Sequence, residues 1–183
     1  MTKQEARKWI KDQYQTLSVD YKKKANEDIQ NQVLHMESYQ QAKTIFCYVN
    51  MDHEVSTRII LEHALKEGKR VGVPLCYGKG IMDVREIKSL EDLEPGLWGI
   101  LEPKKDLPVI NQDEIDFGVI PCVSASLDGK RLGHGAGYYD RYLEGTAFEK
   151  VLVCFGKLIL DNIPVDEYDV MMDQVICERR NQG

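Results

Sequence analysis

Three glycines alternate with other residues in the segment DGKRLGHGAGYYDRYL, which covers residues 128–143. Glycine allows positive φ and close backbone approach, so successive N–H groups in such a segment can converge on an anion. Arg131 precedes the glycines and supplies a planar fork that suits phosphate. The segment lies between an apolar stretch and an expected helix, the position at which open α/β sheets bind ligands. The spacing is therefore compatible with a phosphate-binding loop.

The same spacing also fits a plain glycine-rich turn, because it matches neither the Walker A nor the Rossmann pattern. Tyr138 and Tyr139 offer flat surfaces that either stack on a ligand or pack against the protein. Asp140 is a hard oxygen ligand suited to Mg²⁺, or else a cap or dipole partner at a helix start. Residue types alone leave each of these alternatives open.

A second set of candidate residues is basic and lies at the amino terminus. Lys3, Arg7 and Lys11 are spaced four residues apart, which places them on one face of a helix. Like charges at this spacing repel one another, and an anionic ligand would relieve that repulsion. The alternative is an ordinary solvated charged face.

Helical periodicity and caps define the elements that position these residues. The apolar positions of the first two expected helices run from Ala6 to Leu17 and from Ala25 to Met36, and a third helix is expected from Ser56 to Gly68. Ser18 or Asp20 can cap the second helix, and Ser56 or Thr57 the third, with Gly68 as its stop. A further short helix is expected from Tyr138.

Short apolar segments between these helices predict strands. They cover residues 44–50, 71–76, 81–87, 116–123, 150–156 and 174–178. The segment 81–87 alternates and is predicted to be an antiparallel or edge strand. Residues 93–112, which include Trp98, are rich in proline and predict a long surface loop. Strands that alternate with helices indicate an α/β sheet covered on both faces.

Composition limits the possible functions. The chain has 183 residues, is 43% hydrophobic and carries a formal net charge of −6, which suits a globular domain and argues against a nucleic-acid-binding protein. Neither a signal peptide nor a membrane-spanning run is visible, so we expect a cytoplasmic protein. The five cysteines form no CxxC pair and show no zinc-type spacing with the histidines, so we expect small buried thiols.

The sequence GKRLGHGAGYYDRYL closely resembles the signature of the 5-formyltetrahydrofolate cyclo-ligase family, whose members are also called 5,10-methenyltetrahydrofolate synthetases. The resemblance extends over most of the chain. NMDHEVST resembles the folate segment of the family, WGILEP its central loop, and PVDEYDVMMD its carboxy-terminal acidic segment. The chain departs from residues common in the family at four positions, which are His134, Ala136, Tyr168 and Cys177.

The resemblance implies a fold and an activity. The implied fold is a single three-layer α/β domain over residues 1–183, with a mostly parallel central sheet, similar to the fold of sugar-phosphate isomerases and CoA-transferases. Family members use ATP and Mg²⁺ to convert 5-formyltetrahydrofolate into 5,10-methenyltetrahydrofolate, ADP and phosphate. No nucleic acid, membrane or obligate protein partner is expected.

The resemblance also implies roles for individual residues. Arg131 and Tyr139 would be catalytic, and Asp140 and Asp169 would hold Mg²⁺. The implied ATP-binding residues are Lys3, Arg7, Arg131, Leu132, Gly133, His134, Gly135, Ala136, Gly137, Tyr138 and Tyr139. The implied folate-binding residues are Val49, Met51, Glu54, His134, Gly135, Ala136, Gly137 and Tyr138.

Two other interpretations compete with the cyclo-ligase. One is a relative of the sugar-phosphate isomerases or CoA-transferases, which the GYYD motif and the basic amino-terminal helix disfavour. The other is a catalytically silent nucleotide- or folate-binding module. Asp140 disfavours it, because a metal ligand serves phosphoryl transfer more than simple binding. Individually, Glu54 also fits a helix-entry charge, Met51 also fits core packing, and Asp169 also fits surface charge.

Overall fold

A six-stranded sheet forms the centre of the protein, whose computed structural model describes residues 1–96 and 99–179. The strand order is β10-β9-β6-β1-β2-β3, and every neighbouring pair is parallel except β2 and β3. The strands are β1 (Thr44–Cys47), β2 (Arg70–Gly78), β3 (Ile81–Ile87), β6 (Phe117–Ile120), β9 (Glu149–Val153) and β10 (Gln174–Ile176). The predicted α/β class with a mostly parallel sheet is confirmed, and so is the antiparallel edge strand over residues 81–87.

The central strands are buried on both faces. All four residues of β1 and all four of β6 are buried, and Ile45 of β1 pairs with Val71 on one side and Phe117 on the other. A parallel strand covered on both faces reads as a continuous apolar run, which is why the sequence identified these strands.

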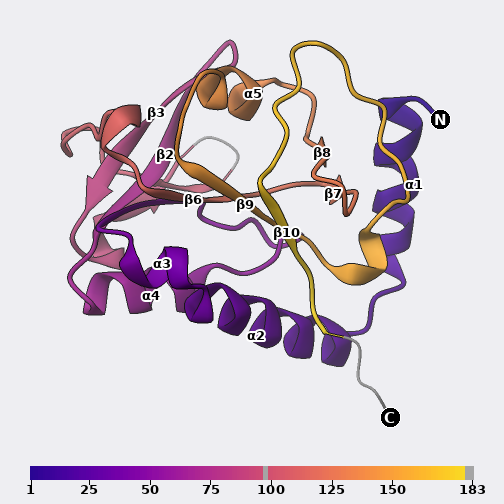
Figure 1. Ribbon diagram of the computed structural model, residues 1–183, viewed down its shortest axis with the longest axis horizontal. Coiled ribbons are helices and arrows are strands. Elements are labelled where there is room, and N and C mark those ends of the chain that lie inside the picture. The colour runs from indigo at the N-terminus through magenta and orange to yellow at the C-terminus, as the bar shows by residue number, and fades with distance from the viewer. Residues whose placement is uncertain (97–98, 180–183) are drawn as a thin grey trace.

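Helices cover both sides of the sheet (Figure 1). The lower layer contains α2 (Val19–His35), α3 (Glu37–Gln41) and α4 (Arg58–Lys66). The short helix α5 (Tyr138–Leu143) lies on the upper side, and α1 (Lys3–Gln15) stands beside the sheet near the short antiparallel pair of β7 (Ser124–Ala125) and β8 (Arg131–Leu132). Short 3₁₀ turns lie at Leu90–Asp92, Gln112–Glu114 and Gly156–Leu158.

The start of α4 differs from the expected side-chain cap. Ser18 does cap α2, accepting a hydrogen bond from the N–H of Tyr21. Thr57 holds the N-cap position of α4, but its hydroxyl donates to the Tyr48 carbonyl at 2.8 Å. Gln30 of α2 instead accepts hydrogen bonds from the first-turn N–H groups of α4. Ser56, the other expected cap, accepts the Arg58 N–H at 3.4 Å. A tertiary contact thus supplements a weak local cap.

The segment expected to be one long surface loop also contains regular structure. The strands β4 (Leu93–Pro95) and β5 (Leu101–Pro103) form an antiparallel pair, and β5 packs against β2 and β3. Their prolines are tolerated because the pair is short and has free edges. Trp98 lies outside the described residues.

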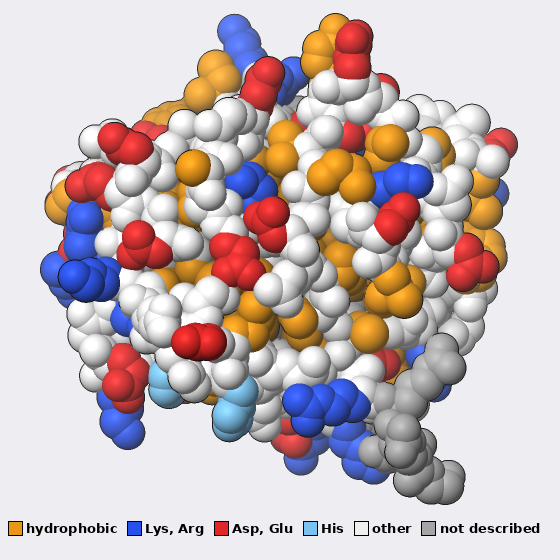
Figure 2. Space-filling view, viewed as in Figure 1, with side chains coloured by type: hydrophobic (Ala, Val, Ile, Leu, Met, Phe, Trp, Pro, Cys, Tyr) orange, Lys and Arg blue, Asp and Glu red, His pale blue; other side chains and the backbone are white. Residues whose placement is uncertain are grey.

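Two observations concern the surface. On the face shown in Figure 2, acidic and basic side chains of the described residues are interspersed rather than segregated, in line with the modest negative net charge. Within residues 1–96 and 99–179, no helix combines the length and the apolar character that crossing a membrane requires.

Candidate active site

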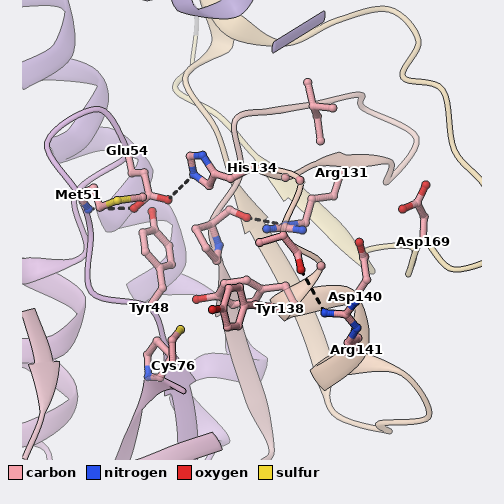
Figure 3. A pocket seen from close by; sticks show the side chains of 18 of the residues that line it. Tyr48, Met51, Glu54, Cys76, Arg131, His134, Tyr138, Asp140, Arg141 and Asp169 are labelled. Atoms are coloured by element: carbon pink, nitrogen blue, oxygen red, sulfur yellow. Dashed lines mark hydrogen bonds and ion pairs between the residues drawn. The ribbon is translucent and has the colours of Figure 1, made fainter. Parts of the chain in front are cut away.

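A pocket of about 850 Å³ opens beside the carboxyl ends of β1 and β6 (Figure 3). Such an edge is the usual ligand position in an open parallel sheet. Every site residue named from the sequence lines this pocket: Lys3, Arg7, Val49, Met51, Glu54, Arg131, Leu132, Gly133, His134, Gly135, Ala136, Gly137, Tyr138, Tyr139, Asp140 and Asp169. The fold therefore brings together residues from both ends of the chain.

The glycine loop joins β8 to α5 and needs at least two of its glycines for backbone reasons. Gly135 and Gly137 have φ of 104° and 76°, values that residues with a Cβ rarely adopt. Arg7 of α1 donates from Nε to the Gly133 carbonyl at 2.7 Å, and its guanidinium packs over Gly135. A helix at the amino terminus thus places a cation directly on the loop.

Arg131 is anchored below the same loop. It is 9% exposed, and its Nε donates to the Pro121 carbonyl at 2.6 Å. Its guanidinium carbon lies 4.9 Å from the centre of the Tyr139 ring, and a Cβ at Gly133 would approach one terminal nitrogen to 2.8 Å. A side chain at position 133 would therefore displace the Arg131 guanidinium, whose terminal nitrogens lie beside the loop.

Lys3 and Asp169 pair with each other, although the sequence assigned them to different ligands. The Lys3 ammonium lies 2.7 Å from Asp169 and 3.2 Å from Asp166. Burial lowers the pKa of Lys3, but the hydrogen bonds and charges of the two carboxylates outweigh it, so the Lys3 pKa is raised. A nucleotide phosphate or a cation that enters here competes with this ion pair.

Asp140 and Asp169 offer an incomplete but suitable donor set for Mg²⁺. Burial raises the pKa of Asp140, and the charge of Asp169 adds to the rise, while the Val170 N–H, Arg131 and Lys3 oppose it. Across residues 1–96 and 99–179, no group of three or more His, Cys, Asp or Glu is arranged to hold a metal. Mg²⁺ commonly uses one or two carboxylates together with substrate phosphates and water, so the two carboxylates fit a metal that arrives with a nucleotide.

Glu54 defines the other end of the pocket, on the opposite side of Arg131 from Asp169 (Figure 3). Its side chain is 5% exposed, and Oε1 accepts a hydrogen bond from the Met51 N–H at 2.9 Å. Oε2 lies 3.6 Å from Nε2 of His134, whose ring meets that of His53 edge-on at 5.4 Å between centroids. A buried carboxylate with so few partners is suited to accept N–H groups from a ligand.

Comparison with models of known protein families assigns the chain to one of them. A model of the 5-formyltetrahydrofolate cyclo-ligase family matches residues 1–178. The chain belongs to the 5-formyltetrahydrofolate cyclo-ligase family. This membership identifies the chain as an enzyme, which is the interpretation that the glycine signature favoured over a silent binding module.

Individual relatives and solved structures agree with the family match. The chain is 34% identical over 166 residues to a probable 5-formyltetrahydrofolate cyclo-ligase of Schizosaccharomyces pombe, covering 81% of each chain. It is 28% identical over 182 residues to the mouse 5-formyltetrahydrofolate cyclo-ligase, covering 92% of this chain and 90% of the relative. The Aquifex aeolicus 5,10-methenyltetrahydrofolate synthetase superposes with a TM-score of 0.85 at 27% identity, covering 100% of this chain and 95% of that one.

The structure adds residues to the cyclo-ligase pocket that the sequence did not single out. They are Tyr48, Pro74, Cys76, Ile100, Leu101, Glu102, Pro121, Arg141, Glu144, Asp166 and Tyr168. Arg141 donates to the carbonyls of Ala136 at 3.1 Å and Lys79 at 3.4 Å, so it joins the glycine loop to the β2–β3 turn. Burial raises the pKa of Glu102. Several of them lie in segments that the sequence analysis quoted without giving each residue a role: Ile100, Leu101 and Glu102 in WGILEP, Arg141 in the glycine signature, and Asp166 and Tyr168 in PVDEYDVMMD.

Proposed function

We propose that the enzyme cyclises 5-formyltetrahydrofolate to 5,10-methenyltetrahydrofolate in a reaction that consumes ATP and requires Mg²⁺. The observation that carries this proposal is the difference in chemical character between the two ends of the pocket. One end has a glycine loop together with cations from α1 and carboxylates from α5 and the 166–169 turn. The other end has the buried Glu54 carboxylate, whose Oε2 lies 3.6 Å from His134. The first end suits a metal-bound triphosphate, and the second suits the amino-pyrimidinone edge of a pterin.

The chemistry explains why both ligands must share one pocket. The N5-formyl group is an amide, and its carbon is a poor electrophile. Attack of the formyl oxygen on the γ-phosphorus releases ADP and converts that oxygen into a phosphate ester. N10 then bonds to the activated carbon and loses its proton, and the C–O bond breaks to release phosphate. No protein nucleophile is needed, so catalysis consists of alignment and charge stabilisation.

The residues of the chain divide this work by position. Lys3, Arg7 and the N–H groups of the glycine loop bind the phosphates. Arg131, held by Pro121 and Tyr139, directs its terminal nitrogens at the transferred group. Asp140 and Asp169 would hold Mg²⁺, which when bound neutralises phosphate charge. Glu54 accepts N–H groups of the pterin and fixes the formyl oxygen toward the nucleotide.

The activity itself is the first test. Purified enzyme should produce 5,10-methenyltetrahydrofolate, followed by its absorbance, and ADP in equal molar amounts. Both should appear only when ATP, Mg²⁺ and the 5-formyl isomer are all present. Product formation at the same rate without ATP would overturn the proposed reaction.

A variant of Glu54 tests the orientation of the two ligands. Glu54→Gln keeps an oxygen for the Met51 N–H, but it removes the charge and turns an amide donor toward the pterin. A mismatched buried polar contact costs roughly 1–3 kcal/mol, so the affinity for 5-formyltetrahydrofolate should fall at least several-fold, while the KM for ATP stays near wild type. A selective loss of ATP affinity would reverse the assignment of the two ends.

A further inference from the structure

A tight turn over residues 166–169 lines the proposed nucleotide end of the pocket. The Asp166 N–H donates to Oδ2 of Asp169 at 2.8 Å, and the Tyr168 N–H donates to Oδ1 of Asp166 at 2.9 Å. The Asp169 N–H returns to the Asp166 carbonyl at 3.2 Å. Lys3 binds both carboxylates from α1. These bonds fix the backbone that carries the side chain of Tyr168.

Tyr168 presents an uncovered ring on this fixed turn. The residue lines the pocket and is 76% exposed. Within residues 1–96 and 99–179, only its backbone N–H has a hydrogen-bond partner, and its ring stacks on no other ring or cation. The other tyrosines deeper in the pocket differ. Tyr48 donates to the Val55 carbonyl at 2.5 Å, and Tyr139 lies under Arg131. Tyr138 also lines the pocket, but it is partly buried and packs against the main core. Among the pocket tyrosines in residues 1–96 and 99–179, Tyr168 therefore presents the most exposed ring to a ligand.

We propose that Tyr168 is the stacking platform for the heteroaromatic base of the nucleotide. The inference rests on the proposed function, which places the phosphates against Lys3 and the glycine loop. Tyr168 adjoins Asp169 in the chain, and the Lys3 ammonium bonds to Asp169 at 2.7 Å. A base linked through its ribose to phosphates bound there lies within reach of the turn. Glu54, to which the proposed function assigns the pterin, lies on the other side of Arg131 (Figure 3).

Stacking on this ring accounts for affinity without strict base selection. Every nucleobase has a π face, and stacking of a base on an aromatic side chain is worth about 1–3 kcal/mol. The ring makes no edge-specific hydrogen bond that would distinguish one purine from another. The platform therefore fits nucleoside triphosphates whatever their base, and its loss weakens binding of the base and leaves the phosphates bound as before.

The test compares a ligand that has a base with one that lacks it. Calorimetry measures the binding of Mg-ATP and of Mg-tripolyphosphate to the wild-type enzyme, Tyr168→Ala and Tyr168→Phe. Tyr168→Ala should bind Mg-ATP at least about fivefold more weakly and bind Mg-tripolyphosphate as the wild type does. Tyr168→Phe keeps the ring and should match the wild type with both ligands. All three proteins should have the same Tm, because the side chain is exposed.

The possible results separate this inference from the function on which it rests. Unchanged Mg-ATP affinity in Tyr168→Ala would overturn the stacking role. An equal loss of Mg-ATP and Mg-tripolyphosphate would also overturn it, because the turn would then act on the phosphates. If the wild-type enzyme bound neither ligand, the proposed function itself would fail.

Discussion

Asp140 is a carboxylate that the fold holds where a negative charge is unfavourable. It follows the glycine loop in the first turn of α5, accepts the Val170 N–H at 3.3 Å, and has its pKa raised mainly by burial. A group that destabilises the folded chain yet lines the pocket is typical of a functional residue. Its charge becomes useful once a cation is present.

Replacing Asp140 by Asn should therefore separate activity from stability. Asn keeps the size and one acceptor oxygen but removes the charge that balances Mg²⁺, so kcat should fall steeply and added Mg²⁺ should restore part of it. Because the folded-state pKa of Asp140 is raised, the ionised carboxylate lowers the stability of the wild type at neutral pH, and this cost disappears as pH falls through that pKa. At neutral pH Asp140→Asn should therefore melt no lower than the wild type.

Kinetics over a range of Mg²⁺ concentrations and melting curves at neutral and acidic pH measure these two effects. Asp161→Asn is a suitable control, because Asp161 is an exposed acid outside the pocket, and its rate and Mg²⁺ dependence should remain those of the wild type. An unaltered kcat and Mg²⁺ dependence in Asp140→Asn would place the metal elsewhere.

Among the elements, α4 shows how a contact between helices supplements a weak local cap. Its first-turn N–H groups at Ile59 and Ile60 reach Oε1 of Gln30 at 2.9 and 3.4 Å, while Thr57 is occupied with the Tyr48 carbonyl. Gln30 is 2% exposed. The main cap therefore comes from a different helix, and the Thr57 bond ties the start of α4 to the segment that leads from β1 to Glu54.

Removing this cap should destabilise the protein without changing its chemistry. Gln30→Met keeps the length of the side chain but leaves two N–H groups without a strong acceptor, which costs roughly 1–3 kcal/mol. Equilibrium urea unfolding measures the loss. Gln41→Ala alters an exposed glutamine of α3 that bonds to Glu37 and should change the free energy of unfolding by less than about 0.5 kcal/mol. Equal stability of Gln30→Met and the wild type would contradict the capping role.

The elements also show what the sequence could and could not predict. The predicted bounds of strand 81–87 agree with those of β3, because its apolar and polar residues alternate clearly, as is typical of an edge strand. The helix α3, with five residues, is too short to show a period, and the β4–β5 pair has three residues in each strand. Short elements of this kind form because neighbouring elements hold them, and that information is not local.

At the scale of the whole molecule, the pocket depends on contacts that sequence spacing does not encode. Lys3 and Asp169 are 166 positions apart, and Arg7 and Gly133 are 126 apart. Residue types and spacing singled out the glycine loop and the basic face of the first helix, but only the family resemblance indicated that the two meet in one site. The bond between Lys3 and Asp169, the anchoring of Arg131 and the part played by Arg141 all required the folded chain.

The helix α1 is attached to the rest of the protein by few buried side chains. This helix supplies both cations of the nucleotide end, yet its buried residues are only Ala6 and Ile10, and Ala6 packs in a small cluster separate from the main core. An element with few buried contacts opens locally more easily than the central strands. A nucleotide bound between α1 and the glycine loop adds contacts that local opening must break, so Mg-ATP should slow amide exchange in residues 3–15.

Hydrogen-exchange mass spectrometry measures this exchange, with α2 as an internal reference that Mg-ATP should leave nearly unchanged. In Lys3→Met the protection of α1 should be much weaker. If Mg-ATP protected the glycine loop but not α1, the two amino-terminal cations would not hold the nucleotide.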